Sequence, residues 1–88
     1  MPRALVFINT RNDTSEVVKS LEQVEGVREA HSSRGMYDAV AMVQGENFSE
    51  VREIVSKRIR SLDSVKSTLT LTLIESPTKV FIFSFFLA

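Results

Sequence analysis

Two short runs in this sequence are apolar at every position, Leu5–Ile8 and Ala39–Val43. Successive side chains of a β-strand point to opposite faces of the sheet, so a strand that is apolar throughout has no face suited to water. The first run is β-branched and aromatic, which favours a strand. These runs therefore predict two strands at the centre of a sheet whose two faces both need cover.

Two helices are predicted next to these strands. Asp13 with Glu16, and Asn47 with Glu50, have the spacing of a capping box at the start of a helix. Gly26 lies where a left-handed residue would end the first helix. In each segment apolar residues recur on one helical face, which would pack on the sheet. They are Val17, Val18, Leu21 and Val24 in the first helix, and Phe48, Val51, Ile54, Val55, Ile59 and Leu62 in the second, longer one.

Two further strands complete the pattern. Val27–Arg34 is more polar and is typical of a strand with one solvent-exposed side. Gly35–Asp38 is predicted to form a turn into the next strand. Val65–Ile74 alternates between two sides, with Ser67, Leu69, Leu71 and Leu73 on one and Thr68, Thr70 and Thr72 on the other. A shift of 38 positions lays Val17, Leu21, Val24 and Val27 onto Val55, Ile59, Leu62 and Val65, which indicates two related β-α-β halves.

The order β-α-β-β-α-β predicts an α+β, ferredoxin-like fold with a four-stranded antiparallel sheet and two helices on one face. The helices leave the other face bare, although both central strands are apolar there, and soluble monomers rarely expose large apolar patches. A homodimer joined sheet to sheet through an isologous interface is the simplest cover. The phenylalanine-rich segment after Pro77 favours an additional C-terminal strand, paired along the sheet or across a subunit boundary. We expect a ferredoxin-like domain over residues 1–76 and an apolar strand or tail over residues 77–88.

Composition excludes several classes of protein. Eleven basic and eleven acidic residues cancel, so the basic footprint of a nucleic-acid-binding protein is missing. There is no cysteine, which fits a cytoplasmic protein, and the longest apolar runs are too short to span a membrane. His31 is the only histidine and has no second metal ligand at a suitable spacing. We expect no metal, no cofactor, no catalytic residue and no enzymatic activity.

Four blocks carry a resemblance to a known family. They are Val24-Glu25-Gly26-Val27-x-Glu29-Ala30, Gly35-Met36-Tyr37-Asp38-Ala39-Val40, Ile54-Val55-x-x-x-Ile59-Arg60-x-Leu62 and Val65-x-Ser67-Thr68-x-Thr70. In this order the blocks resemble the ligand-binding (RAM) domain of the Lrp/AsnC transcription regulators, from about residue 4 to residue 75. Full-length family members carry an N-terminal helix-turn-helix domain, and here the first strand begins within a few residues of Met1, so the chain resembles a stand-alone RAM module. The pair Asp63-Ser64, where the family often has glycine, and the phenylalanine-rich tail depart from the pattern.

The resemblance implies dimers joined through their sheets, octamers or decamers built from those dimers, and amino acid effectors bound between dimers. It also implies a role in transcription regulation of amino acid metabolism, exerted through a DNA-binding Lrp/AsnC relative. The positions that carry over as ligand-binding residues are Gly35, Met36, Tyr37, Asp38, Ser67, Thr68 and Thr70.

These positions also have plainer interpretations. The Asp38 carboxylate suits a ligand ammonium group and the hydroxyls suit a carboxylate, but Asp38 is equally a common turn residue. Tyr37 is equally a packing residue, and the threonines follow ordinary strand preference. Two other functions stay open: a small dimeric ferredoxin-like (dimeric α/β barrel) enzyme with His31 as acid or base, and an ACT-type sensor of small molecules.

Overall fold

The computed structural model describes residues 1–11, 13–75 and 80–87, with side chains up to residue 73. The elements follow in the order β1 (Arg3–Thr10), α1 (Thr14–Glu22), β2 (Val27–Ser32), β3 (Ala39–Gln44), α2 (Phe48–Glu53), the π-helical segment η1 (Ile54–Ile59), β4 (Val65–Glu75) and β5 (Val80–Leu87). The predicted β-α-β-β-α-β order is confirmed, and β5 follows it. The domain boundary predicted between residues 76 and 77 lies outside the described residues.

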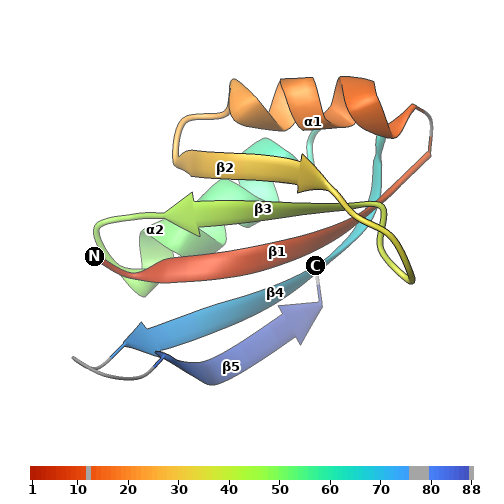
Figure 1. Ribbon diagram of the computed structural model, residues 1–88. Coiled ribbons are helices and arrows are strands. Elements are labelled where there is room, and N and C mark those ends of the chain that lie inside the picture. Colours follow the sequence, from red (N-terminus) through yellow and green to blue (C-terminus); the bar gives the residue numbers. More distant parts are fainter. Residues whose placement is uncertain (12, 76–79, 88) are drawn as a thin grey trace.

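The strands form one antiparallel sheet in the order β2-β3-β1-β4-β5 (Figure 1). β1 and β3 are the central pair of the predicted four strands. Phe7 of β1 lies opposite Val40 of β3 and Leu69 of β4. The predicted extra C-terminal strand pairs along the sheet, next to β4, so the backbone of β4 is not left as the sheet edge.

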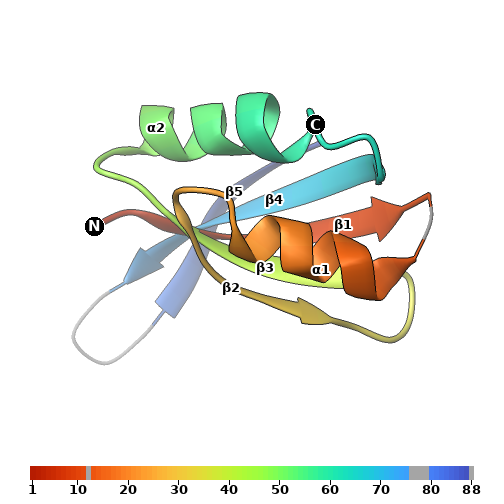
Figure 2. The same cartoon turned by 90° about the horizontal axis from the view of Figure 1, so that it is seen from above.

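Both helices pack on the same face of the sheet, with α2 behind the sheet and α1 along the β2 side (Figures 1 and 2). The N-cap half of each predicted capping box is present: an oxygen of Asp13 accepts from the Ser15 backbone N–H at 2.9 Å, and Oδ1 of Asn47 accepts from the Glu50 backbone N–H at 2.8 Å. The helices and the inward side of the sheet share one buried core: Ala4, Val6, Ile8, Val17, Leu21, Ala30, Ala39, Ala41, Val43, Val51, Ile54, Val55, Ile59 and Val65.

Helix α1 ends earlier than Gly26 predicts. Its last residue is Glu22, and the backbone N–H of Val24 already turns back to the Leu21 carbonyl oxygen at 3.0 Å. Gly26 instead lies in the turn into β2, with φ +100°, where the Val27 N–H donates to the Val24 carbonyl oxygen at 3.1 Å. The glycine is needed for a left-handed conformation, but one turn later than the end of the helix.

The second helix is not α-helical throughout. After Glu53 it widens into η1, and the Arg60 N–H donates to the Val55 carbonyl oxygen five residues earlier, at 3.0 Å. Ile54, Val55 and Ile59 are still buried, because the segment keeps its apolar stripe on the core. A π-helix is rare, and its single turns occur often at functional sites.

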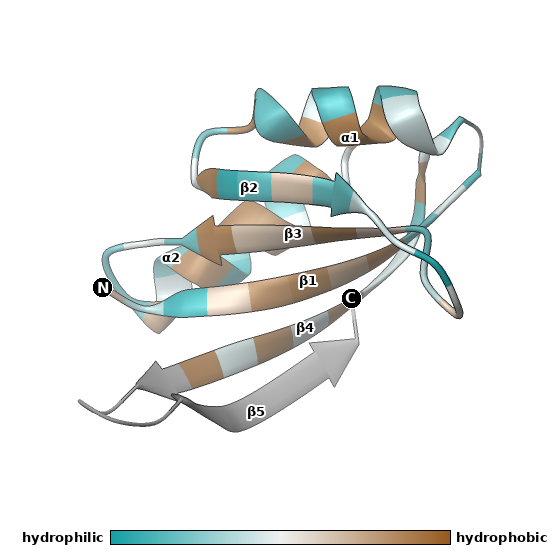
Figure 3. Ribbon diagram, in the orientation of Figure 1, coloured by the Kyte–Doolittle hydropathy of each residue, from teal (hydrophilic) through white to brown (hydrophobic). Residues whose placement is uncertain are grey.

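The face of the sheet opposite the helices carries the remaining apolar side chains of the central strands. We call this the open sheet face and define it by Leu5, Phe7, Val40, Met42, Leu69 and Leu71, all partly buried in the single chain. Figure 3 shows β1 and β3 hydrophobic along most of their length and β4 alternating. No helix covers this face in the described parts of the chain. The apolar character that the sequence predicts on both faces is therefore present.

The Asp13 cap makes stability depend on pH. Its carboxylate accepts hydrogen bonds from the Ser15 hydroxyl at 2.7 Å and the Ser15 N–H at 2.9 Å, and these lower the pKa of Asp13 below its ordinary value of 3.8. A depressed folded-state pKa stabilises the chain above the ordinary value and loses that effect as pH falls through the folded-state value.

We therefore expect the stability difference between wild type and Asp13→Asn, a neutral cap, to shrink as pH falls below 3.8. Urea unfolding at several pH values measures this difference. A difference that stays constant from neutral pH down to acid would contradict the prediction.

No helix in residues 1–11, 13–75 and 80–87 is both long enough and apolar enough to cross a membrane.

Candidate functional site

The predicted Gly35–Asp38 turn is fixed to the end of β1 by Asp38. The Asp38 N–H donates to the Ile8 carbonyl oxygen at 2.9 Å. Its carboxylate Oδ2 accepts from the Thr10 N–H at 2.8 Å and lies 3.3 Å from the Thr10 hydroxyl. Asp38 thus joins the loop between β2 and β3 to the end of β1, which agrees with the turn interpretation and also fixes the position of its carboxylate.

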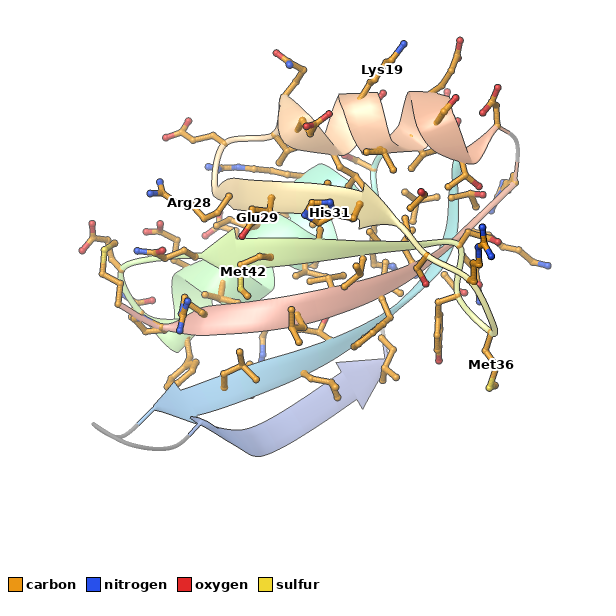
Figure 4. The ribbon with its side chains drawn as sticks, viewed as in Figure 1. Lys19, Arg28, Glu29, His31, Met36 and Met42 are labelled. Carbon is orange, nitrogen blue, oxygen red and sulfur yellow. The ribbon has the colours of Figure 1, made fainter. Side chains whose placement is uncertain are left out.

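The other turn residues differ in their surroundings. The ring of Tyr37 packs on Phe7, with centroids 5.6 Å apart and planes tilted by 50°. Met36 is 88% exposed and projects from the tip of the loop (Figure 4). Gly35 has φ +105°, and a side chain there would meet no atom within 4 Å, so this glycine serves the turn rather than a close backbone approach.

The three hydroxyl residues predicted on β4 divide between two faces. Ser67 lies on the open side, where its Oγ accepts from Asn9 Nδ2 at 3.3 Å. Thr68 and Thr70 lie in the core between the sheet and the helices, at 2% and 0% exposure. The structure therefore brings Gly35, Met36, Tyr37, Asp38 and Ser67 to one end of the sheet, and we call these five residues the turn site. Burial weighs against contact between Thr68 or Thr70 and a ligand at the surface.

Thr70 carries a buried hydroxyl for which the described residues provide no hydrogen-bond partner. Leaving a buried polar group unsatisfied costs about 1–3 kcal/mol. We therefore expect Thr70→Val to raise the free energy of unfolding by about 1 kcal/mol, because valine keeps the branched shape without the hydroxyl. Urea unfolding measures the change. A variant clearly less stable than wild type would show that the hydroxyl has a partner.

Residues at the end of β1 also form part of this region, and the sequence patterns do not indicate them. The polar character of Asn9 and Thr10 favours a turn, but β1 continues through both and has a register shift against β4 between them. Asn9 contacts Ser67 and Thr10 contacts Asp38. The pairing of the strands could have identified these two residues. Because β3 and β4 flank β1, the residues after Ile8 lie beside Asp38 and Ser67.

A second feature, at the opposite end of the sheet, is a cleft of about 370 Å³. It lies between α2 with η1 and the turn into β2, and its walls are mostly charged. The charged lining residues are Glu25, Arg28, Glu50, Glu53 and Arg58. Outside the cleft, His31 is paired with Glu29 at 3.3 Å, and no group of three or more potential metal ligands lies among the described residues.

The fold defines a ferredoxin-like α+β domain in which one sheet face is covered by helices and the other is open. The chain belongs to the Lrp/AsnC ligand binding domain family, whose model matches residues 3–80. The resemblance found in the four sequence blocks is thereby confirmed.

Two curated relatives match parts of their own length. The regulatory protein AsnC of Haemophilus influenzae is 26% identical over 72 residues, which is 82% of this chain and 48% of that protein. Homocitrate synthase of Sulfolobus acidocaldarius is 37% identical over 57 residues, which is 65% of this chain and 12% of that enzyme. The chain thus spans less than half the length of either relative.

Solved structures share the fold. TTHA0845 from Thermus thermophilus is 30% identical, with a TM-score of 0.82, and the match covers 90% of this chain and 100% of that one. The transcriptional regulator NMB0573 from Neisseria meningitidis, in its complex with L-Met, has a TM-score of 0.75 at 13% identity, over 94% of this chain and 56% of that one. At that identity the second likeness shows the fold alone.

Proposed function

We propose that this chain is a regulatory effector-binding module that works as a sheet-to-sheet homodimer, or a larger ring of such dimers, and binds an amino acid. The observation that carries the proposal is the open sheet face. Its six apolar side chains lie on the three adjacent strands β3, β1 and β4, with Leu5 opposite Met42 and Leu71, and no layer of this chain covers them in the described residues. A second copy would bury this face, as symmetric dimers commonly do.

Membership of the family supports effector binding as the module's own property. The two curated relatives are a regulatory protein and an enzyme, and this chain spans 48% of one and 12% of the other. A segment matched in proteins with such different activities fits a shared sensing role better than a role in either activity. We propose that its effect on transcription is exerted through a DNA-binding Lrp/AsnC relative with which it assembles.

The turn site is the proposed position of the effector. Asp38 offers a carboxylate held by Thr10, and Ser67 offers a hydroxyl nearby on the sheet. An amino acid presents an ammonium group and a carboxylate, so it needs an acceptor and donors of this kind. An effector bound at the end of the sheet would lie beside the proposed dimer face, where it could favour one assembly over another.

A thermal-shift screen of the twenty amino acids, beginning with L-methionine, tests this proposal. A ligand that binds only the folded chain raises its melting temperature. The informative variant is Asp38→Asn, because the amide oxygen still accepts from the Thr10 N–H, at 2.8 Å in wild type, while the charge is lost. We expect one or a few amino acids to stabilise wild type, and Asp38→Asn to weaken their binding about tenfold or more without loss of the fold.

Glu46→Gln, an exposed change that lies outside the turn site and also removes one carboxylate charge, is the control and should respond as wild type does. Equal responses from wild type and Asp38→Asn would contradict the turn site. No response to any amino acid would contradict amino acid sensing itself.

The alternative of a small enzyme requires a cavity at His31. The cleft at the other end of the sheet does not include His31, and the His31 side chain is 66% exposed, paired only with Glu29 among the described residues (Figure 4). This placement supports sensing over acid-base catalysis as the function to test first.

A further inference from the structure

The charged cleft is separate from the turn site. The turn site lies where β1 ends and β3 begins, whereas the cleft lies where β2 begins and β3 ends. Its walls come from α2, η1, the turn into β2 and the adjoining ends of β2 and β3, and none of its lining residues belongs to the open sheet face. A second copy that covers the open sheet face therefore leaves the residues of the cleft outside that contact.

The local backbone is built around this cleft in two ways. Gly26 lines the cleft, and a side chain there would collide with Ile54, so glycine allows the turn to pack directly on the helix. Arg28 lies at a register shift between β2 and β3 and projects beyond the start of β2 (Figure 4). Bulges of this kind re-aim a side chain and are common next to binding sites.

The helical wall of the cleft spans the junction between α2 and η1. Glu50 and Glu53 belong to α2, and Arg58 belongs to η1. Arg58 Nη1 donates to the Glu25 carbonyl oxygen at 2.9 Å, which fixes its guanidinium group across the cleft. The π-helical segment therefore forms part of the cleft wall, and such segments often mark functional sites.

The charges of the lining define a class of ligand. Three carboxylates, of Glu25, Glu50 and Glu53, and two guanidinium groups, of Arg28 and Arg58, line the cleft, and the Glu53 carboxylate is already paired with Lys57 at 3.4 Å. Arg58 is already engaged with a carbonyl oxygen, and no hydrogen bond or ion pair holds the Arg28 side chain among the described residues. The complementary ligand has one carboxylate for Arg28 and two cationic groups for the carboxylates of Glu25 and Glu50, which are unpaired within the part of the chain that the structure describes.

We propose that this cleft binds a small basic amino acid, with one carboxylate and two ammonium groups, at a site distinct from the turn site. The ligand's two ammonium groups and one carboxylate match the Glu25 and Glu50 carboxylates and the Arg28 guanidinium group, and a volume of about 370 Å³ accommodates a molecule of that size. We expect the Arg28 guanidinium group to bind the carboxylate of the ligand through two parallel hydrogen bonds.

Two-dimensional amide NMR of the full chain, titrated with three matched probes, tests the proposal. L-lysine has all three charges, L-norleucine lacks the side-chain ammonium group, and cadaverine lacks the carboxylate. We expect L-lysine to cause saturable shifts at Gly26, Arg28 and Glu50, and each of the other two probes to bind at least about tenfold more weakly.

Two variants locate the effect. Arg28→Gln should weaken L-lysine binding by about tenfold and bring it close to cadaverine binding, because both changes remove the same ion pair. Arg34→Gln, an arginine on the loop between β2 and β3, removes the same charge outside the cleft and should leave binding unchanged.

The outcomes separate this inference from the proposed function. No saturable shifts with L-lysine, equal binding of the three probes, or equal weakening by Arg28→Gln and Arg34→Gln would each overturn the inference. Shifts confined to the turn site would also overturn it, while supporting the proposed function. Shifts in the cleft that persist in Asp38→Asn would support the inference regardless of the result at the turn site.

Discussion

Gly26→Ala is expected to lower the free energy of unfolding by about 3 kcal/mol. Two costs add: about 1–2 kcal/mol for a side chain at positive φ, and about 1–3 kcal/mol for forcing atoms into a packed core. Both apply because Gly26 has φ +100° and its added Cβ would collide with Cδ1 of Ile54, which is 1% exposed. Urea unfolding of wild type and variant at equal protein concentration measures the difference.

Gly35→Ala is the matched control, because Gly35 has nearly the same backbone angle, φ +105°, and no atom within 4 Å of the added Cβ. It should cost only the conformational part, about 1–2 kcal/mol. The difference between the two variants therefore isolates the collision with Ile54. Equal losses in the two variants would contradict the close packing of the turn on η1.

Leu5→Lys is expected to weaken self-association by more than about 100-fold, equivalent to about 3 kcal/mol. Leu5 lies on the central strand of the open sheet face, opposite Met42 and Leu71. In a single protomer the lysine ammonium group can reach water, but in a sheet-to-sheet dimer it would be buried without a partner. Sedimentation equilibrium of the variant measures the loss, and circular dichroism confirms that the protomer remains folded.

Ser20→Lys is the control for Leu5→Lys. It adds the same charge at an exposed position on α1, away from the open sheet face. We expect it to associate as wild type does. If Ser20→Lys dissociated the assembly as strongly as Leu5→Lys, added charge rather than the open sheet face would be the cause.

Most of the fold follows from local sequence patterns. The apolar runs of β1 and β3, the caps at Asp13 and Asn47 and the alternation of β4 each reflect short-range chemistry, and each is present in the structure. The end of α1 at Glu22 and the π-helical segment were not predicted, and between them the turn at Gly26 packs closely on Ile54. That contact joins residues 28 positions apart, and no local pattern encodes it.

The candidate site was predictable only in part. The β2–β3 turn was placed correctly because glycine and aspartate have strong turn preferences, and Gly35 indeed has positive φ. The alternation of β4 correctly separated Ser67 from Thr68 and Thr70, but nothing in that alternation says which side faces the helices. The charged cleft was missed because its residues come from three separate segments and share no spacing.

Sedimentation velocity of wild type at micromolar concentration tests the central claim most directly, that a second copy covers the open sheet face. The protomer has a mass of 9.9 kDa. We predict a species of twice that mass, or a multiple of the dimer, which Leu5→Lys reduces to a folded protomer. A well-folded 9.9 kDa wild-type species at the same concentration would contradict the claim.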